Sequence, residues 1–573
     1  MKSPRSPEGG AAGRPGRRPA DPYGPLARSP DPYGRPPGTP GRWPADPYAR
    51  PAATPGRRPP DRYPGAYAAP GPAPREAAGR GTVLLLAGLS LAGIGISMAL
   101  IGAVSLLGPS AAVPRLPSAF PWPLFYLHAQ PGTGLVTWSL WLAVLAAAAG
   151  VTAGLLAVRR GWQPRARLLV AGSLIAVLGL MLLPPVGSKD LLDDAVYGRI
   201  AAQGYSPYQM TPAKYQQTGD PMAALATRFW SRDPSPYGPL MTVTQEAASK
   251  LGGDNGARTM FWLKAWNALA FLAIALALNR LLRSDPRRRT RAHLLWTANP
   301  LMLLAVMAGG HNDVLGAVFG VLALAAFRRA DFMDGLLAGV LAGTAVVLKA
   351  PFALIGAGLV VAAIRAPRAL SGLALGAVAV IVPTYAIAGK QAITAVVSKS
   401  GAAFDAYQPW QLLARIVPSL GSVSGTNALA LAVTVVLAAV LLWRMPAGPA
   451  EFAAVRPALA LMLAWLICSP LQRTWYDVMI FPLLALMPAS RLDWIVLARA
   501  GITAIGQLPG VTSPATIPLW LERDVTALNE VLVPGAIVVL AATLAWLCLT
   551  GRIAGSFAAG HRARAAPRHA TLR

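Results

Sequence analysis

The sequence predicts an all-α, polytopic integral membrane protein with about 14 (12–14) transmembrane helices and a large extracytoplasmic loop in its first half. Its 573 residues are 54% hydrophobic and only 13% charged. Many apolar runs approach the roughly 20 residues that a helix needs to cross hydrocarbon. Runs such as TVLLLAGLSLAGIGISMALIGAVSLL are apolar on every side, whereas soluble helices keep a polar face and barrel strands alternate.

The connections between the expected spans alternate in charge. RRGWQPRAR (159–167), RLLRSDPRRRTR (280–291) and RAPR (365–368) are basic, while 108–134 carries only Arg115. Because basic loops stay in the cytoplasm, we expect both termini there and a multi-pass protein of the plasma membrane. The expected spans are 82–107, 135–158, 166–186, 258–280, 292–308, 312–327, 332–348, 351–364, 369–388, 426–443, 456–470, 475–488, 492–508 and 533–550.

Three regions follow from composition. Residues 1–80 are rich in Pro, Gly, Arg and Ala, repeat DPY, and hold fourteen basic residues against six acidic ones. Such a segment cannot offset its chain entropy by burial, so we expect a disordered cytoplasmic tail. It is either a docking tail for a cytoplasmic partner or anionic lipid, or a solvated tether. The transmembrane catalytic domain is 81–550, and 551–573 is a second basic cytoplasmic tail.

Several classes of protein are disfavoured. The net charge of +28 lies largely in the tails, and no compact basic groove with interleaved aromatics indicates nucleic-acid binding. Cys468 and Cys548 lie in apolar runs and predict neither a disulfide nor a metal site. The P-loop, zinc-protease and serine-hydrolase motifs are absent from credible contexts. The first apolar run begins only near residue 82, so we expect no cleaved signal peptide.

A cluster of carboxylates follows the apolar run that ends near residue 186. Three aspartates and a tyrosine are spaced i, i+3, i+4 and i+7, so a helix would hold them on one face. Repulsion between close carboxylates raises the pKa of at least one, which suits a general base or a metal site. The alternative is a solvated cap on an interfacial helix. The residues are Asp190, Asp193, Asp194 and Tyr197.

Two further outward-facing motifs suit a sugar or phosphate ligand. SPYGP (235–239) fixes Tyr237 between prolines, and it partners SPY (206–208); an exposed rigid ring suits carbohydrate, although a plain structural turn is the alternative. GGHND (309–313) places His311, Asn312 and Asp313 near hydrocarbon, where polar groups indicate function. Asn312 or Asp313 is alternatively the N-cap of the following helix.

Two cations stand at outward helix ends. Lys349 precedes Pro351, and Arg473 lies beside Trp475 and Tyr476. Either side chain can neutralise a lipid-linked phosphate, for which arginine is the better bidentate partner. The alternative for both is snorkelling to lipid headgroups.

The motifs together resemble the GT-C glycosyltransferases, which use polyprenyl-phosphate sugars at the outer membrane face. DLLDDAVYGRIAAQGYSPY (190–208) is similar to the D…GR…G…PY signature of the polyprenol-phosphate-mannose-dependent α-1,6-mannosyltransferases of actinobacterial type, the MptA/MptB group. Asp190, Arg199 and Tyr208 fall on that signature. SPYGPL, ANPL (298–301), GGHND, the lysine–proline pair and RTWYD (473–477) resemble further family motifs in the same order. Leu192 and Asp194 stand where the family often has aromatics.

The resemblance implies an inverting transferase. Mannose would move from polyprenyl-phosphate-mannose to a lipid-anchored mannan acceptor of lipomannan or lipoarabinomannan type, forming α-1,6 linkages outside the membrane. The catalytic candidates are Asp190, as general base, Asp193 and Asp194. The candidates for binding the donor phosphate and the substrates are Arg473, Lys349, His311, Asn312, Asp313, Tyr208, Tyr237, Trp475, Tyr476 and Arg199.

Three alternatives stay open. Another polyprenyl-phosphate sugar such as arabinose fits the same architecture. A lipid or sugar transporter or flippase would use intramembrane Asp and His as a proton relay, but the polar motifs lie at span ends and no internal repeat is evident. No cofactor is required, because a metal is optional with a lipid-phosphate leaving group; the acidic cluster is nevertheless a candidate site for Mg²⁺ or Mn²⁺.

Overall fold

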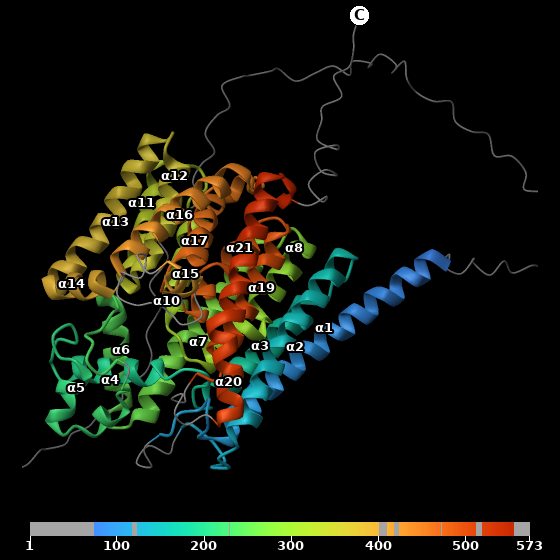
Figure 1. The fold of residues 1–573 in the computed structure, drawn as a ribbon. Coiled ribbons are helices and arrows are strands. Elements are labelled where there is room, and N and C mark those ends of the chain that lie inside the picture. The colour runs from blue at the N-terminus through green and yellow to red at the C-terminus, as the bar shows by residue number, and fades with distance from the viewer. Residues whose placement is uncertain are drawn as a thin grey trace, which may run out of the picture. The chain divides into compact units, whose positions relative to one another are not determined.

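The structure, a computed structural model, describes residues 74–116, 123–228, 230–399, 409–417, 423–471, 473–510 and 518–554. Within these ranges the chain forms helices and no strand (Figure 1). The predicted tail up to residue 73 and the basic end from residue 555 lie outside them. The first helix begins at Pro74, inside the range predicted for the tail, because proline suits a first helical position and Glu76, Ala77 and Ala78 favour a helix.

The helices follow one another with short connections. The α-helices are α1 (Pro74–Leu107), α2 (Thr133–Arg159), α3 (Ala166–Met181), α4 (Asp190–Ala202), α5 (Pro212–Tyr215), α6 (Pro239–Gly252), α7 (Gly256–Leu281), α8 (Pro286–Ala292), α9 (Pro300–Leu303), α10 (Asp313–Ala326), α11 (Phe332–Leu348), α12 (Ala353–Ala363), α13 (Pro367–Ala388), α14 (Lys390–Lys399), α15 (Pro409–Ile416), α16 (Val423–Arg444), α17 (Val455–Cys468), α18 (Phe481–Leu486), α19 (Leu492–Gln507), α20 (Leu519–Ala527) and α21 (Val533–Leu549). Short 3-10 or π segments are η1 (Gln216–Thr218), η2 (Pro221–Leu225), η3 (His293–Thr297), η4 (Leu304–Ala308), η5 (Ala350–Phe352), η7 (Ala450–Phe452), η8 (Thr474–Met479), η10 (Leu528–Leu532) and η11 (Arg552–Ala554).

The described helices are those of a membrane protein. Six are long and apolar enough to cross a membrane, and six shorter apolar helices accompany them. Only 17% of the most apolar window of α13 is buried, against 61% in α2. The outward apolar surface of α13 therefore suits lipid contact, whereas α2 lies inside the bundle. The number of fourteen spans and the orientation in the membrane stay predictions.

The expected span 292–308 is interrupted. The side chain of Asn299 accepts a hydrogen bond from the amide of Leu301 at 3.0 Å, and Pro300 opens the short helix α9. Proline has no amide hydrogen, so the chain restarts its helix here. Every residue of 292–308 is buried, so its apolar composition fits a span and a broken internal segment equally well.

Arginines from two connections predicted to be cytoplasmic meet at the first turn of α19. Arg291 forms a buried ion pair with Asp493 at 2.5 Å, and Arg159 approaches the same carboxylate at 3.8 Å. The other end of this helix, at Gln507, lies near His311, because both residues line one small pocket. The arginine connections and the GGHND turn therefore lie toward opposite ends of α19, as the predicted alternation requires.

A polar segment, residues 187–255, covers one end of the bundle, where α4, α5 and α6 lie together (Figure 1). Its attachment to α11 depends on Gly238, whose amide donates to the carbonyl of Leu348 at 3.2 Å. A Cβ atom on Gly238 would lie 2.2 Å from the carbonyl oxygen of Val347, so only glycine permits this approach. The motif SPYGP is thereby held beside Lys349.

Helix α11 is itself fixed by close packing on α13. A Cβ atom at Gly339 would lie 2.2 Å from the carbonyl oxygen of Leu373, and one at Gly376 would lie 2.2 Å from that of Leu336. Small residues let the two backbones touch, which is a common way of joining helices in membranes. This contact positions the end of α11 from which Lys349 projects.

Candidate functional site

A cavity of about 560 Å³ lies where five chain segments meet. Carboxylates, cations and aromatic rings from α4, the loop before α6 and the region of η8 form most of its wall, and apolar side chains from α12, α14 and α17 complete it. The lining residues are Asp190, Asp193, Asp194, Tyr197, Trp230, Asp233, Pro236, Tyr237, Lys349, Ala350, Pro351, Ala353, Leu354, Val396, Trp465, Ser469, Leu471, Arg473, Trp475 and Tyr476.

The expected acidic helix is present as α4, which begins at Asp190. The hydroxyl of Ser188 accepts a hydrogen bond from the Asp190 amide at 3.1 Å, which helps to start the helix. All four residues of the predicted face line the cavity. Asp193 and Asp194 are only 3% and 2% exposed, so the alternative of a solvated cap does not fit this helix.

The two buried carboxylates are held by hydrogen bonds. Asp193 accepts from the amide and the hydroxyl of Thr227 at 2.9 and 2.6 Å. Asp194 accepts from Gln245 at 2.9 Å and from Asn312 at 3.0 Å. Burial raises the pKa of Asp193 to about 7, against the opposing effect of its hydrogen bonds. Burial and the neighbouring charge of Asp190 raise the pKa of Asp194 well above its ordinary value.

Asp190 is the most accessible of the three carboxylates on α4, with 22% of its side chain exposed. The indole Nε1 of Trp230 donates to its Oδ1 at a long 3.4 Å. Its Oδ2 faces Nε2 of His311 at 3.9 Å. A carboxylate that is open to the cavity and loosely bonded is suited to take a proton from a ligand.

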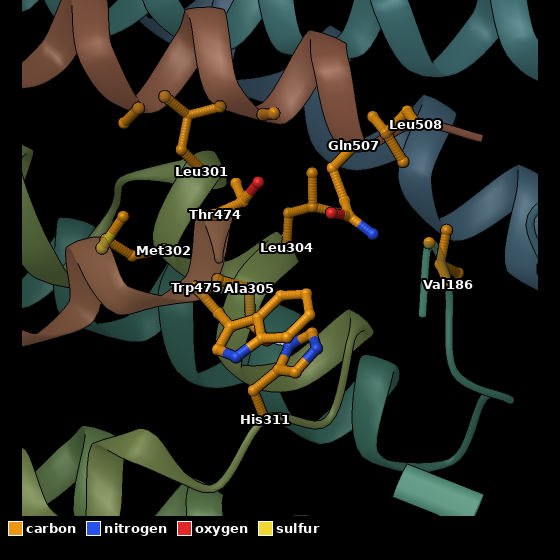
Figure 2. Close-up of a pocket in the computed structure, with 13 residues that line it drawn as sticks. Val186, Leu301, Met302, Leu304, Ala305, His311, Thr474, Trp475, Gln507 and Leu508 are labelled. Carbon is orange, nitrogen blue, oxygen red and sulfur yellow. Dashed lines mark hydrogen bonds between the residues drawn. The ribbon is translucent and has the colours of Figure 1, made fainter. Parts of the chain in front are cut away.

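His311 lies behind the cavity wall. Its ring stacks on the indole of Trp475 with centroids 3.7 Å apart and planes 12° apart, as Figure 2 shows. Its Nδ1 lies 2.7 Å from the carbonyl oxygen of Ala305. Burial lowers the pKa of His311. The expected turn at GGHND is found, because Gly310 adopts a φ of 77°, a conformation that favours glycine.

The two cations differ in their partners. Lys349 forms a short ion pair with Asp313 at 2.6 Å and lies 4.8 Å from the ring centre of Tyr476. Only 12% of its side chain is exposed, so it does not snorkel toward a lipid surface. Arg473 lies between two aromatic rings, with its guanidinium carbon 5.8 Å from the centre of Trp230 and 5.9 Å from that of Trp475. Both cations line the cavity.

The two SPY motifs meet, as the sequence predicts. The amide of Ser235 donates to the carbonyl of Pro207 at 2.9 Å. Tyr237 is half-buried in the cavity wall, where the sequence predicts an exposed ring. Burial raises the pKa of its hydroxyl well above the ordinary value, so the hydroxyl keeps its proton and hydrogen-bonds to Asp194.

Three other candidates are placed differently from expectation. Arg199 is not among the lining residues; it pairs with Asp220 at 2.8 Å and Asp254 at 2.5 Å. Tyr208 is also outside the lining, and its hydroxyl bonds to that of Thr242 at 2.8 Å. Asn312 occupies the N-cap position of α10 but makes no capping bond with its side chain, because its amide donates to Asp194.

Several residues of the site carry no sequence signal. Gln245 and Thr227 hold the buried carboxylates from positions in α6 and in a loop, and neither belongs to a recognisable motif. Trp230 and Asp233 belong to FWSRD, a polar and aromatic stretch near SPYGP that pointed to the site without assigning them a role. Trp465 comes from an apolar helix in which nothing distinguishes it.

The acidic cluster does not fit a metal ion. Across the residues that the structure describes, no group of three or more His, Cys, Asp or Glu side chains is arranged to hold one. Asp193 and Asp194 also direct carboxylate oxygens toward the hydrogen-bond donors Thr227, Gln245 and Asn312. Mg²⁺ and Mn²⁺ need free carboxylate oxygens, which these two residues do not offer.

Comparison with known sequences confirms the resemblance found in the motifs. The family described as alpha-(1->6)-mannopyranosyltransferase, N-terminal domain, matches residues 92–366. The match contains the acidic helix, SPYGP, GGHND and Lys349, and it ends before Arg473.

Curated relatives bear the same description. An alpha-(1->6)-mannopyranosyltransferase of Mycobacterium tuberculosis is 29% identical over 139 residues, 24% of each chain. Alpha-(1->6)-mannopyranosyltransferase B of Corynebacterium glutamicum is 25% identical over 137 residues, 24% of this chain and 23% of the relative. Alpha-(1->6)-mannopyranosyltransferase A of the same organism is 27% identical over 180 residues, 31% and 35% of the two chains. The chain thus spans about a quarter to a third of the length of the relatives it matches.

The buried state of Asp193 predicts a pH-dependent stability. Its pKa of about 7 in the folded protein exceeds the ordinary value of 3.8, so the folded state binds the proton more tightly. Unfolding free energy from this group therefore falls as the pH rises from about 4 to about 7. Asp193→Asn should reduce that slope by up to about 1.4 kcal/mol per pH unit.

Thermal unfolding of detergent-solubilised protein between about pH 5 and pH 8 measures this slope. Asp524→Asn, at an exposed position on α20, is the matched control and should keep the parent slope. An Asp193→Asn variant with the same pH dependence as the parent would show that this carboxyl does not titrate as described.

Proposed function

Given this family match, we propose that the protein is a membrane glycosyltransferase that moves mannose from polyprenyl-phosphate-mannose to a lipid-anchored mannan, forming an α-1,6 linkage with inversion. The observation that carries the proposal is the placement of Asp190, an accessible carboxylate, and Arg473, a cation between aromatic rings, in one cavity. Transfer from a sugar phosphate needs these two groups, a base for the acceptor hydroxyl and a positive charge for the leaving phosphate.

The donor phosphate is assigned to Arg473. Lys349 is close by, but its charge is already matched by Asp313 at 2.6 Å. The guanidinium of Arg473 offers a planar set of donors that suits two phosphate oxygens. Lys349 then adds long-range attraction and orients Tyr476, whose ring lies under its ammonium group.

The remaining walls suit a lipid chain and a sugar. Leu354, Val396 and Leu471 supply apolar surface to the cavity, which suits the first isoprene units of the donor. Trp230 and Tyr237 supply aromatic surface at the carboxylate side, where a mannose ring can pack. The cavity of about 560 Å³ lies within the ordinary range of small-molecule sites.

The proposed reaction is one displacement at the anomeric carbon. The acceptor hydroxyl oxygen bonds to that carbon, the bond from carbon to the phosphate oxygen breaks, and its electron pair leaves with the phosphate. Asp190 takes the hydroxyl proton. Asp193 and Asp194, whose pKa values are raised by burial, limit the negative charge on α4 near neutral pH, so that the anionic donor is not repelled by three ionised carboxylates.

The first experiment measures transfer of radiolabelled mannose from polyprenyl-phosphate-mannose to an α-1,6-mannoside acceptor by membranes that contain the protein. Asp190→Asn should lower the rate about 10²–10⁴-fold, because a positioned general base contributes that much. Asp524→Asn, on α20 and outside the cavity, should transfer at the parent rate.

Parallel arms use polyprenyl-phosphate-arabinose and an acceptor series. Transfer of arabinose alone would replace the sugar and leave the reaction class in place. No transfer of either sugar by a folded protein would contradict the proposed function and favour transport.

The role of Arg473 is tested by the dependence of the rate on donor concentration. Arg473→Gln should raise the KM for the donor roughly tenfold to a hundredfold, because it removes a charge-assisted hydrogen bond. Arg473→Lys should fall between the parent and the glutamine variant, since it keeps the charge without the fork. Arg228→Gln, an exposed arginine of the same outer segment, is the control and should keep the parent KM. An unchanged donor KM in Arg473→Gln would place the phosphate elsewhere.

A further inference from the structure

His311 carries a polar atom that the hydrogen bonds within the described residues leave without a partner. Its Nδ1 lies 2.7 Å from the Ala305 carbonyl oxygen, which can only accept, so Nδ1 bears the hydrogen. In the neutral ring Nε2 then carries the lone pair. This atom is buried, the residue is 6% exposed, and it makes no hydrogen bond. A buried acceptor without a donor is costly unless the working protein supplies one.

The donor that the geometry offers is Asp190. Its Oδ2 faces Nε2 at 3.9 Å, and two acceptors at this separation do not bond to one another. Once Asp190 has taken a proton, its O–H becomes a donor aimed at a waiting lone pair. The approach required is about 1 Å, and Asp190 is loosely enough held to make it, since the bond from Trp230 is 3.4 Å long.

The histidine ring is held in place. Trp475 covers one face of the ring at 3.7 Å. A Cβ atom at Gly309 would lie 2.5 Å from Cε1 of the ring, so glycine is needed to leave room for it. The ring and the indole also form part of the wall of a small apolar pocket of about 30 Å³, with Leu304 and Leu508, shown in Figure 2.

The charges around the ring come from three other elements. Asp190 on α4 and Asp313 on α10 favour a protonated ring, while Lys349, after α11, disfavours it. Asp313 is already paired with Lys349 at 2.6 Å. Burial outweighs the carboxylates and lowers the pKa of His311, so the neutral ring is the state that faces Asp190.

We propose that His311 is a positioning residue for the base: its Nε2 accepts a hydrogen bond from Asp190 Oδ2–H after Asp190 has taken the acceptor proton. The inference rests on the proposed function. The hydroxyl oxygen bonds to the anomeric carbon, the phosphate leaves with its electron pair, and the proton stays on Asp190, held toward His311 and away from the product. Because the bond exists only in the protonated state, it strengthens Asp190 as a base.

His311→Phe tests this, because phenylalanine keeps the ring that stacks on Trp475 and removes the acceptor. The parent enzyme and the variant are compared by mannose transfer across pH, with kcat and KM determined separately. The variant should show a kcat about tenfold lower, an unchanged donor KM, and an acidic limb of kcat/KM shifted to lower pH by about one unit. His311→Gln, whose amide oxygen can accept, should restore part of both.

His293→Phe is the matched control. His293 is equally buried and bonds to Thr297 at 2.9 Å, but it does not line the cavity, so its acidic limb should match that of the parent. An unmoved acidic limb in a folded His311→Phe protein would overturn the inference while transfer by the parent still supports the proposed function. A raised donor KM with an unmoved limb would instead make His311 a phosphate ligand. No transfer by the parent would overturn both.

Discussion

The site depends on the hydrogen bonds that satisfy two buried carboxylates. Thr227 bonds Asp193, and Gln245 and Asn312 bond Asp194, so three aspartates can share one end of α4. These donors come from a loop, from α6 and from the turn before α10. The same bonds therefore join the outer segment to the helices that present Lys349 and His311. Asp190 is left accessible because its neighbours are held so firmly.

Much of this arrangement could be predicted from local patterns. The i, i+3, i+4, i+7 spacing predicted the face of α4, and the paired SPY motifs predicted a contact that the Ser235 amide makes. The glycines of GGHND predicted the tight turn that Gly310 forms. Such features depend on short stretches of chain, where spacing and backbone preference decide the structure.

What the patterns missed depends on distant partners. Arg199 was expected at the substrate, but Asp220 and Asp254 neutralise it outside the cavity. Gln245 is one polar residue among many in α6 until the fold places it 2.9 Å from Asp194. The break at Pro300 is hidden for a similar reason, because a buried internal segment has the same apolar composition as a membrane span.

The most direct test of the central claim is a structure of Asp190→Asn with bound polyprenyl-phosphate-mannose, since the slowed variant should retain its donor. The account predicts the phosphate within hydrogen-bond distance of Arg473, the polyprenyl chain along Leu354 and Val396, and the anomeric carbon open to the side chain at position 190. A phosphate bound away from Arg473, or a sugar out of reach of position 190, would contradict it.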